Sequence, residues 1–459
     1  MQDIPDKIHF IGIGGAGMSG LARVLLDLSY DVRGSDINST PVTERLKAQG
    51  ATIYKGHAGA NVGDAALVVY STAISDENQE IQAAREKGVP VIHRADLLGL
   101  LMRRQKGLAV AGAHGKTTTS AMLALVLEKC QQDPTILIGG ELTDIGGNAK
   151  LGRGAFLVAE ADESDRSFLK LRPHLAVVTN IEDDHLDHYG SVEEIIYAFR
   201  QFIKKIPANG TAVLCFDDGQ VRAMAKECAG RLVTYALDNP SADYTMRDVR
   251  VDAGRSTGEV YFKGQHLGQL VLAVPGRHNL ANALAVVAVC CDIGLSFSEV
   301  VECLKCFKGA GRRYQLLGRE KGITVIDDYA HHPTEIAATL RAARQVHPGR
   351  VIAVFQPHRY TRTKLLYNRF GSCFGDADLV IINDIYSAGE KPIAGVSAQL
   401  IVDAVYDHKG ERPIKLPSGG DTVDYLAGML QEGDLVLTMG AGDVWKTGIA
   451  LVNRLKESI

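Results

Sequence analysis

LAVAGAHGKTTTSAMLALVLEK, residues 108–129, joins a short apolar run to a long helical pattern through a glycine-rich turn. A strand, a glycine turn and a helix in this order form a phosphate-binding loop, in which backbone N–H groups and the helix N-terminus face the anion. Lys116 would reach the β and γ phosphates of a nucleotide, and the Thr117 hydroxyl would bind Mg²⁺. The loop departs from the usual G-x-x-x-x-G-K-[ST] pattern, because only Ala113 and His114 separate its two glycines.

A second glycine turn lies near the N-terminus, where GIGGAG (12–17) fits the G-x-G-x-x-G pattern directly after an apolar run. Asp36 ends the next predicted strand. Glycines in this pattern let the backbone approach a diphosphate, and the helix N-terminus favours its charge. Taken alone, the motif indicates a dinucleotide such as NAD. Two diphosphate-binding turns in separate blocks of one chain disfavour an NAD-dependent oxidoreductase, which would leave Lys116 and Thr117 unexplained.

The order strand, glycine-rich turn, helix recurs over three blocks, which suits a length of 459 residues at about 150 residues per domain. Short apolar runs alternating with helices predict parallel strands with crossover connections. Residues 244–274 alternate between polar and apolar side chains, which predicts a small β-rich part. We expect an α/β fold with a Rossmann-like domain at 1–104, a central P-loop-type ATPase domain with a parallel sheet and the β-rich part at 105–311, and a Rossmann-like domain at 312–459.

The composition argues against several classes of protein. Lysine plus arginine number 50 and aspartate plus glutamate 54, a net charge of -4 that argues against a nucleic-acid-binding protein. No apolar window of about 18 residues exists, so we expect no membrane span. Eight scattered cysteines indicate reduced thiols in a cytoplasmic protein. The Cys303–Cys306 and Cys290–Cys291 pairs fit helix faces better than a zinc site, because no second CxxC or nearby histidine completes a ligand set.

Two polar segments that follow predicted strands contain metal-ligating side chains. EADESD (160–165) places Glu160 directly after an apolar run and downstream of the phosphate loop, where carboxylates commonly hold Mg²⁺. A solvated acidic turn is the alternative. In TNIEDDHLDH (179–188), His185 and His188 with neighbouring carboxylates suggest zinc. A second Mg²⁺ with one imidazole ligand and a polar surface loop are the alternatives there.

Basic and histidine-rich segments gather in the third block. RRY (312–314), DDYAHHP (327–333) and QPHRYTR (356–362) lie at the predicted hinge and after two strands. Open α/β sheets bind ligands at the carboxyl ends of their strands. Arg359 and Arg362 could therefore clamp a carboxylate or a phosphate, although each alone also fits a plain surface position.

Taken together, these motifs resemble those of the Mur ligases, and within that family the alanine-adding members. The resemblance covers essentially the whole chain, and it rests on the ordered set and not on any single motif. The set comprises GIGGAGMSG (12–20), GAHGKTT (112–118), EADESD (160–165), NIEDDH (180–185), GRHNLAN (276–282), DDYAHHP (327–333) and QPHRYTR (356–362).

The resemblance implies an ATP-dependent amide-forming ligase of peptidoglycan precursor synthesis. The first domain would bind the UDP part of UDP-N-acetylmuramate in place of NAD, the central domain ATP with Mg²⁺ or Mn²⁺, and the third domain L-alanine. Ligation to the lactyl carboxylate through an acyl phosphate would give ADP and phosphate. A monomer–dimer equilibrium is also expected. A recycling ligase that attaches a peptide, and a non-catalytic nucleotide-binding regulator, are the alternatives.

The resemblance also assigns residues to sites. The implied catalytic residues are Lys116, His331, Arg359 and Arg362. The ATP site would comprise Gly112, Ala113, His114, Gly115, Lys116, Thr117, Thr118, Asn279, Asn282, Arg313 and Asp328. The UDP-sugar site would comprise Gly12, Gly14, Gly15, Ala16, Gly17, Met18, Asp36 and Ser71. The metal ligands would be Thr117, Glu160 and His185.

Some of these assignments carry a specific role. By the resemblance, Asn279 and Asn282 face the adenine, Asp328 faces the ribose or closes the site, and His331 lies on the amino-acid side. Several relatives use a carbamylated lysine downstream of the metal-binding histidine. This chain has Arg200 there, which cannot form the carbamate, and the alanine-adding members are thought not to need it.

Overall fold

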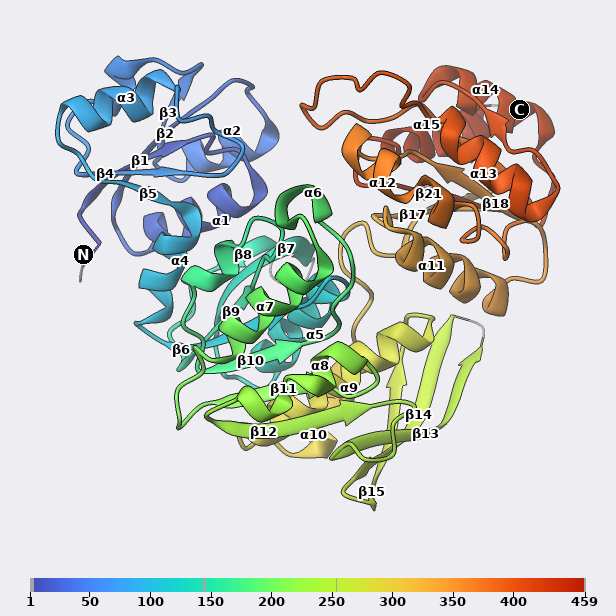
Figure 1. Cartoon of the computed structure of the whole chain (residues 1–459), viewed down its shortest axis with the longest axis horizontal. Coiled ribbons are helices and arrows are strands. Elements are labelled where there is room, and N and C mark those ends of the chain that lie inside the picture. The colour runs from blue at the N-terminus through green and yellow to red at the C-terminus, as the bar shows by residue number, and fades with distance from the viewer. Residues whose placement is uncertain (1–3, 143–145, 253, 458–459) are drawn as a thin grey trace.

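The computed structural model describes residues 4–142, 146–252 and 254–457. Three β-sheets follow one another along the chain, each with helices packed on its faces. Figure 1 shows the N-terminal and C-terminal sheets on opposite sides of the molecule, with the central sheet below and between them. This architecture confirms the predicted three-part α/β fold.

The first sheet has five parallel strands in the order β3-β2-β1-β4-β5. Its strands are β1 (Lys7–Ile11), β2 (Asp31–Asp36), β3 (Thr52–Lys55), β4 (Leu67–Tyr70) and β5 (Val91–His93). Its helices are α1 (Ala16–Asp27), α2 (Pro41–Ala48), α3 (Gln79–Glu86) and α4 (Arg94–Met102). The strand order reverses at β1, so the glycine turn after β1 opens into the crevice where such sheets bind ligands.

The central sheet has ten strands in the order β15-β14-β13-β12-β11-β10-β6-β9-β7-β8. They are β6 (Lys106–Ala111), β7 (Thr135–Leu142), β8 (Gly147–Lys150), β9 (Phe156–Glu160), β10 (Leu175–Val178), β11 (Thr211–Cys215), β12 (Arg231–Ala236), β13 (Tyr244–Asp252), β14 (Arg255–Phe262) and β15 (Gln265–Leu272). The predicted β-rich part is the antiparallel run β13-β14-β15. Strand β6 pairs in parallel with both β9 and β10, so the three polar segments that follow these strands meet at one edge.

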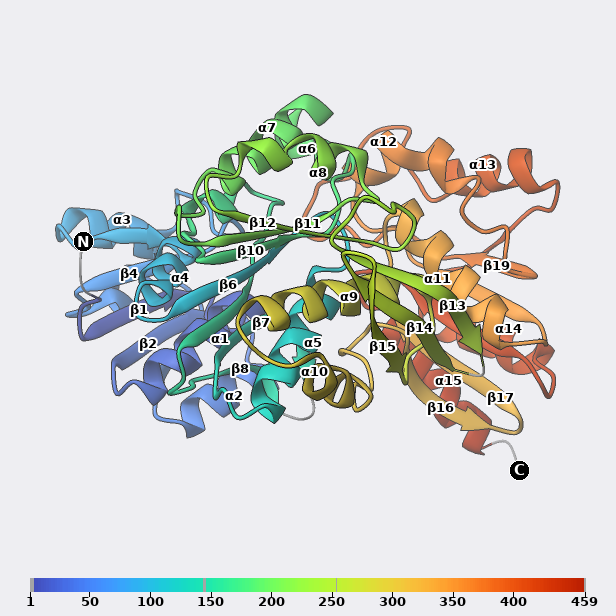
Figure 2. The same cartoon turned by 90° about the horizontal axis from the view of Figure 1, so that it is seen from below.

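Helices cover both faces of this sheet. They are α5 (Lys116–Lys129), α6 (Leu186–Tyr189), α7 (Val192–Ile203), α8 (Gly219–Ala223), α9 (Arg277–Asp292) and α10 (Phe297–Leu304). Figure 2 shows α7 and α8 on one face and α5, α9 and α10 on the other. The predicted helix over 116–129 has these bounds in the structure. Cys303 lies near the C-terminus of α10, whereas Cys306 lies beyond the end of the helix. The CxxC pair therefore does not occupy one helix face, contrary to the prediction.

The third sheet has the order β16-β17-β21-β18-β19-β20. Its strands are β16 (Gln315–Glu320), β17 (Ile323–Asp328), β18 (Val351–Phe355), β19 (Leu379–Ile382), β20 (Ile414–Lys415) and β21 (Leu435–Met439), and only the edge strand β16 is antiparallel to its neighbour. The helices are α11 (Pro333–Val346), α12 (Tyr360–Phe370), α13 (Gln399–Lys409), α14 (Gly420–Met429) and α15 (Trp445–Glu457). The segments 327–333 and 356–362 follow β17 and β18, which flank β21.

The hydrophobic core divides unequally among the three sheets. One cluster runs from the first sheet into the α7 face of the central sheet. A second fills the other face of the central sheet, and the third sheet has two clusters of its own. The N-terminal and central sheets therefore share a core, and the C-terminal sheet does not share it.

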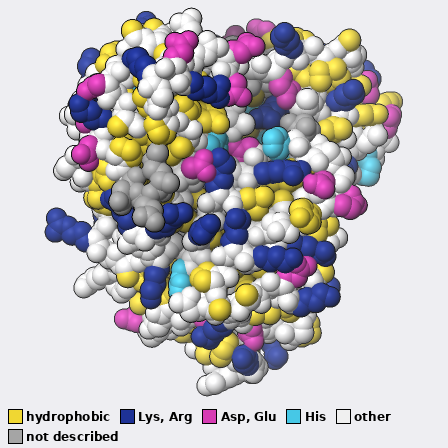
Figure 3. All heavy atoms as spheres, turned by 60° about the vertical axis from the view of Figure 1, so that its left-hand side comes forward, with side chains coloured by type: hydrophobic (Ala, Val, Ile, Leu, Met, Phe, Trp, Pro, Cys, Tyr) yellow, Lys and Arg dark blue, Asp and Glu magenta, His cyan; other side chains and the backbone are white. Residues whose placement is uncertain are grey.

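The surface mixes charges of both signs. Figure 3 shows lysine and arginine side chains interspersed with acidic and apolar ones over the face it presents. Within the described ranges, none of the helices combines the length and the apolar character needed to cross a membrane.

Candidate active site

The loop between β6 and α5 needs both of its glycines. Gly112 has a φ of +136°, and a Cβ there would lie 2.0 Å from Oγ1 of Thr179. Gly115 has a φ of +83°, and a Cβ there would lie 2.6 Å from Oδ1 of Asn282. The left-handed backbone and the lack of space exclude other residues at both positions. This tight packing suits a loop with only two residues between its glycines.

Asn180, in the segment after β10, holds the loop from the other side. Its backbone oxygen accepts a hydrogen bond of 3.1 Å from the Ala113 N–H, and its Oδ1 accepts one of 2.8 Å from the His114 N–H. Thr118 is buried in the first turn of α5. The loop is thus a fixed part of the sheet edge.

Lys116 lies in a buried ring of hydrogen-bond acceptors. Its Nζ donates to the Gly112 oxygen at 2.6 Å and to Oε1 of Glu163 at 2.7 Å. Burial disfavours the ammonium, but the carboxylates of Glu163 and Asp162 outweigh it and raise the pKa of Lys116. Burial also raises the pKa of Glu163 to about 7. The loop therefore carries a firmly protonated lysine beside a carboxyl that titrates near neutrality.

Thr117 and Glu160 form one candidate metal-binding pair. The Thr117 hydroxyl donates to Oε2 of Glu160 at 3.3 Å. The other carboxylate oxygen accepts hydrogen bonds from the Gly139 N–H at 2.6 Å and from Ser120 Oγ at 3.3 Å. A hydroxyl and an oriented carboxylate at a phosphate loop are the hard oxygen donors that Mg²⁺ prefers. The pair therefore fits a magnesium ion on chemical grounds.

His185, the third predicted metal ligand, lies beside different carboxylates. Its Nε2 lies 3.8 Å from Oε1 of Glu163 and 3.5 Å from Oδ2 of Asp184. Burial lowers the pKa of His185, so the imidazole is neutral and has a lone pair available. Since Glu163 also contacts Lys116, it connects His185 to the phosphate loop. His188 is exposed and does not join His185 in any cluster of three metal-ligating side chains within the described residues.

The Arg362 side chain extends from α12 in the C-terminal domain and contacts the central domain. Its Nη2 donates to Oδ1 of Asp184 at 2.8 Å, with both side chains less than a tenth exposed. Despite burial, the Arg362 guanidinium holds the pKa of Asp184 well below its usual range. The pair thus joins the predicted amino-acid segment to the predicted metal segment.

His331 lies on the same side of the interface. Burial and the nearby Arg362 lower its pKa to about 3, so it is a neutral imidazole at working pH and does not titrate there as a histidine normally would. Its Nδ1 lies 3.0 Å from the Tyr329 oxygen. Arg359 has a φ of +70° and its N–H donates to the Tyr386 oxygen at 2.8 Å, which fixes the start of α12.

Of the other residues of the predicted ATP site, Asp328 and Arg313 lie near the hinge and Asn279 lies at the start of α9. Asp328 accepts hydrogen bonds of 2.7 Å from the N–H groups of Tyr314 and Ala330, and burial raises its pKa to about 6. The Arg313 guanidinium lies 5.2 Å from the centroid of the Tyr329 ring. Asn279 donates from Nδ2 to the Pro275 oxygen at 2.7 Å, which leaves its Oδ1 for other contacts.

The N-terminal glycine turn is held by Asp36. Oδ2 of Asp36 accepts a hydrogen bond of 2.9 Å from the Gly14 N–H, and a Cβ on Gly14 would lie 2.9 Å from that oxygen. Gly12 has a φ of +75°. Gly15 precedes α1 and Ala16 and Gly17 begin it, while Ser71 follows β4 across the crevice. The Met18 side chain is buried in the core, and its Cγ would lie 3.8 Å from a Cβ on Gly15 of the turn.

One acidic segment lies between the N-terminal domain and the phosphate loop. Asp162 accepts a hydrogen bond of 2.8 Å from Arg94, whose Nη1 would lie 3.2 Å from a Cβ on Gly17. Glu163 holds Lys116, and Asp165 accepts a hydrogen bond from Thr72. Residues 162–165 therefore lie between the N-terminal turn and the phosphate loop.

The carboxylates that pair with the predicted cations were not predicted from the sequence. Glu163 and Asp184 lie inside the predicted metal-binding segments, but their neighbours Glu160 and His185 were the predicted ligands. Glu335 was missed altogether, and it lies 3.2 Å from Nδ1 of His114 and 3.6 Å from Arg313. A glutamate three residues after a helix-capping position was the available signal for Glu335.

Comparison with known proteins accounts for this arrangement. The family described as "Mur ligase family, catalytic domain" matches residues 7–106, "Mur ligase middle domain" matches 110–290, and "Mur ligase, glutamate ligase domain" matches 312–442. The UDP-N-acetylmuramate–L-alanine ligase of Pelotomaculum thermopropionicum is 61% identical over 457 residues, which is 100% of this chain and 99% of that protein.

Two solved structures extend the comparison. The UDP-N-acetylmuramate–alanine ligase of Thermotoga maritima superposes with a TM-score of 0.83 at 31% identity, covering 99% of this chain and 100% of that one. A murein peptide ligase of Psychrobacter arcticus superposes with a TM-score of 0.73 at 25% identity, covering 98% and 99%. With these matches over its whole length, the chain belongs to the Mur ligase family.

Proposed function

We propose that the protein uses ATP to join L-alanine to the lactyl carboxylate of UDP-N-acetylmuramate, releasing ADP and phosphate. The observation that carries this proposal is the acidic segment 162–165, which contacts Lys116 of the phosphate loop on one side and Arg94 and Thr72 of the N-terminal domain on the other. A sugar nucleotide on the first turn and ATP on the second would present a carboxylate and a γ-phosphate to each other. The alanine-ligating relative with 61% identity supports the choice of substrates.

The residues of the central domain suit the first half of this reaction. A carboxylate is a poor acceptor for an amine, so it must first become an acyl phosphate. Its approach to a γ-phosphate opposes like charges, which Lys116 would neutralise from the loop. Thr117 and Glu160, with His185 nearby, are the residues that would hold Mg²⁺, which when bound withdraws charge from the phosphate oxygens. Glu163, whose pKa is about 7, would become protonated and release the Lys116 ammonium, which would then contact the γ-phosphate.

The residues of the C-terminal domain suit the second half of the reaction, in which the amine attacks the acyl phosphate. Arg359, at the N-cap of α12 on the same segment as Arg362, is our candidate for holding the alanine carboxylate. The neutral His331 would accept a hydrogen bond from the incoming amine. Attack of the amine on the acyl carbon gives a tetrahedral intermediate, which expels phosphate and leaves the amide. The eight cysteines are all free thiols, consistent with a cytoplasmic location for this reaction.

Phosphate release tests this function directly. With ATP, Mg²⁺ and UDP-N-acetylmuramate present, we expect release to require L-alanine and to stop when Mg²⁺ is chelated. Burying one methyl group contributes only about 0.8 kcal/mol, so discrimination against glycine and serine should be modest, while bulky amino acids should fail by steric clash. Release that depends on a peptide and not on alanine would instead establish the recycling ligase.

The ligand of the N-terminal turn is testable by calorimetry. We expect UDP-N-acetylmuramate to bind and NAD not to bind, because the neighbouring loop holds residues for phosphorylating a substrate and none of the described features calls for a hydride carrier. Gly14→Ala should abolish binding, since its Cβ would lie 2.9 Å from Oδ2 of Asp36. Gly219→Ala, which meets open space, is the matched control. Binding of NAD alone would refute the assignment.

A further inference from the structure

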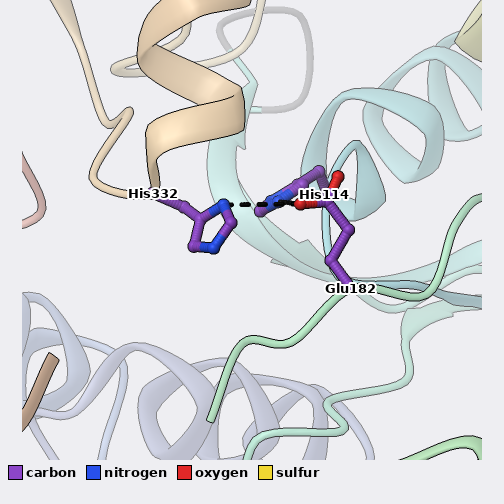
Figure 4. A group of neighbouring side chains, drawn as sticks. All are labelled: His114, Glu182 and His332. Atoms are coloured by element: carbon purple, nitrogen blue, oxygen red, sulfur yellow. Dashed lines mark ion pairs between the residues drawn. The ribbon is translucent and has the colours of Figure 1, made fainter. Parts of the chain in front are cut away.

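A separate group of side chains lies where the central and C-terminal domains meet. His114 comes from the phosphate loop, Glu182 from the segment after β10, and His332 from the position before α11. Figure 4 shows His332 on one side of the group and His114 with the Glu182 carboxylate on the other, with dashed lines marking the ion pairs among them. One ligand atom from each residue lies within 4.8 Å of the others.

The spacing of these atoms suits a shared ion better than hydrogen bonds. Oε2 of Glu182 lies 3.5 Å from Nε2 of His114 and 3.5 Å from Nδ1 of His332. An N–H···O hydrogen bond spans about 2.7–3.2 Å. Two ligand atoms about 2.1 Å from one tetrahedral ion lie roughly 3.4 Å apart. Both distances therefore match edges of a coordination tetrahedron.

The imidazoles also lack other partners on the sides that face the group. The His332 side chain is 0% exposed, and neither of its ring nitrogens has a hydrogen-bond partner. Nε2 of His114 is likewise buried and without one. A buried polar atom left unpaired costs about 1–3 kcal/mol. Two of these nitrogens, Nε2 of His114 and Nδ1 of His332, face the Glu182 carboxylate at 3.5 Å without a hydrogen bond, which leaves room for a ligand shared by all three side chains.

Outer contacts hold two of the three residues in the orientation that ligation requires. Oε1 of Glu335 lies 3.2 Å from Nδ1 of His114, the ring nitrogen that points away from the group. Thr334 donates to Oε2 of Glu182 at 2.6 Å. A carboxylate on the far nitrogen of a ligating histidine is a common support at metal sites, where it fixes the ring and its tautomer.

We propose that His114, Glu182 and His332 form a binding site for a borderline divalent cation such as Zn²⁺, distinct from the magnesium pair Thr117 and Glu160. Two imidazoles and one carboxylate favour zinc or cobalt over magnesium, which prefers oxygen ligands. Because His332 belongs to the C-terminal domain and the other two ligands to the central domain, the bound ion holds the two domains together. This site does not depend on the reaction proposed above.

Cobalt is a suitable probe, because Co²⁺ takes zinc geometries and absorbs visible light when tetrahedral. The full-length protein is titrated with Co²⁺ in a large excess of Mg²⁺, which keeps the oxygen sites filled. We expect one strongly absorbing Co²⁺ per chain and its displacement by Zn²⁺. Loss of even an outer contact weakens metal binding about 10–100-fold, so loss of a ligand in His332→Ala or Glu182→Gln should weaken it at least as much.

Two variants serve as controls. His185→Ala removes a histidine of the phosphate site and should keep the cobalt absorption. His266→Ala removes a surface imidazole that lies 2.8 Å from Glu259, a matched histidine–glutamate pair outside the interface, and should also keep it. Glu182→Gln preserves side-chain shape, so it tests the site even if His332→Ala folds poorly. Absent absorption in the unmodified protein, or absorption that survives Glu182→Gln but not His185→Ala, would overturn the proposal.

Discussion

Lys116→Ala should lower the rate of ligation by about 100-fold or more while the protein stays folded. Loss of one preorganised electrostatic contact to a transferring phosphate commonly has an effect of this size. The fold should tolerate the change, because the carboxyl left behind, Glu163, has a pKa of about 7 and can take up a proton in place of its cation. Steady-state phosphate release and thermal melting measure the two effects separately.

Lys150→Ala is the matched control for this prediction. Lys150 also forms a partly buried ion pair, with its Nζ 2.6 Å from Oε1 of Glu128, but it lies on β8 at the far edge of the central sheet. We expect it to leave turnover unchanged. Near-normal turnover in Lys116→Ala would show that the loop between β6 and α5 does not neutralise the γ-phosphate.

Arg362→Ala should reduce kcat/KM for alanine by on the order of 100-fold. Removing one partner of a buried ion pair costs about 3–5 kcal/mol, because the remaining charge is left buried and unpaired. Here the remaining charge is Asp184, which is 6% exposed. Since the pair joins α12 to the segment after β10, its loss should disrupt the arrangement of the two domains on which amide formation depends. Binding of the sugar nucleotide, measured by calorimetry, should be unaffected.

Arg369 offers a control on the same helix. It pairs with Asp183, the neighbour of Asp184, but the arginine side chain is 43% exposed and the aspartate 30%. Exposed pairs contribute about 0–1 kcal/mol, so Arg369→Ala should change kcat/KM several-fold at most. Equal effects of the two substitutions would mean that Arg362 acts only as one more surface charge, and our account of the interface would fail.

The sequence predicted the elements around the phosphate loop well. The apolar run before it and the helix over 116–129 follow from local pattern, and both glycines of the loop proved sterically required. Strands β7 and β16 were not placed. In β7 the apolar run ends after three residues at Gly139 and Gly140, and β16 is a largely exposed edge strand containing Gly318, so both lack the sustained pattern by which strands are recognised.

The pairing of charges could not be predicted in the same way. Arg362 contacts Asp184 across 178 residues, and Lys116 contacts Glu163 across 47. Such contacts depend on how sheets are placed and not on spacing along the chain. The neutral state of His331 depends likewise on burial and on Arg362, neither of which is visible in the motif that contains it. The roles of these residues stay predictions until the variants are measured.

The two boundaries between neighbouring domains differ in the kind of contact that holds them together. The N-terminal and central sheets share one hydrophobic core. By contrast, Glu182, Asp183 and Asp184 of the central domain contact imidazole, hydroxyl and guanidinium groups of the C-terminal domain. Separating the N-terminal and central domains would expose apolar side chains to water. Separating the central and C-terminal domains would expose mostly polar and charged groups, which water solvates readily. The first two domains thus form one unit with a common apolar core, and separating the third domain from that unit along its polar boundary would expose little apolar surface to promote aggregation.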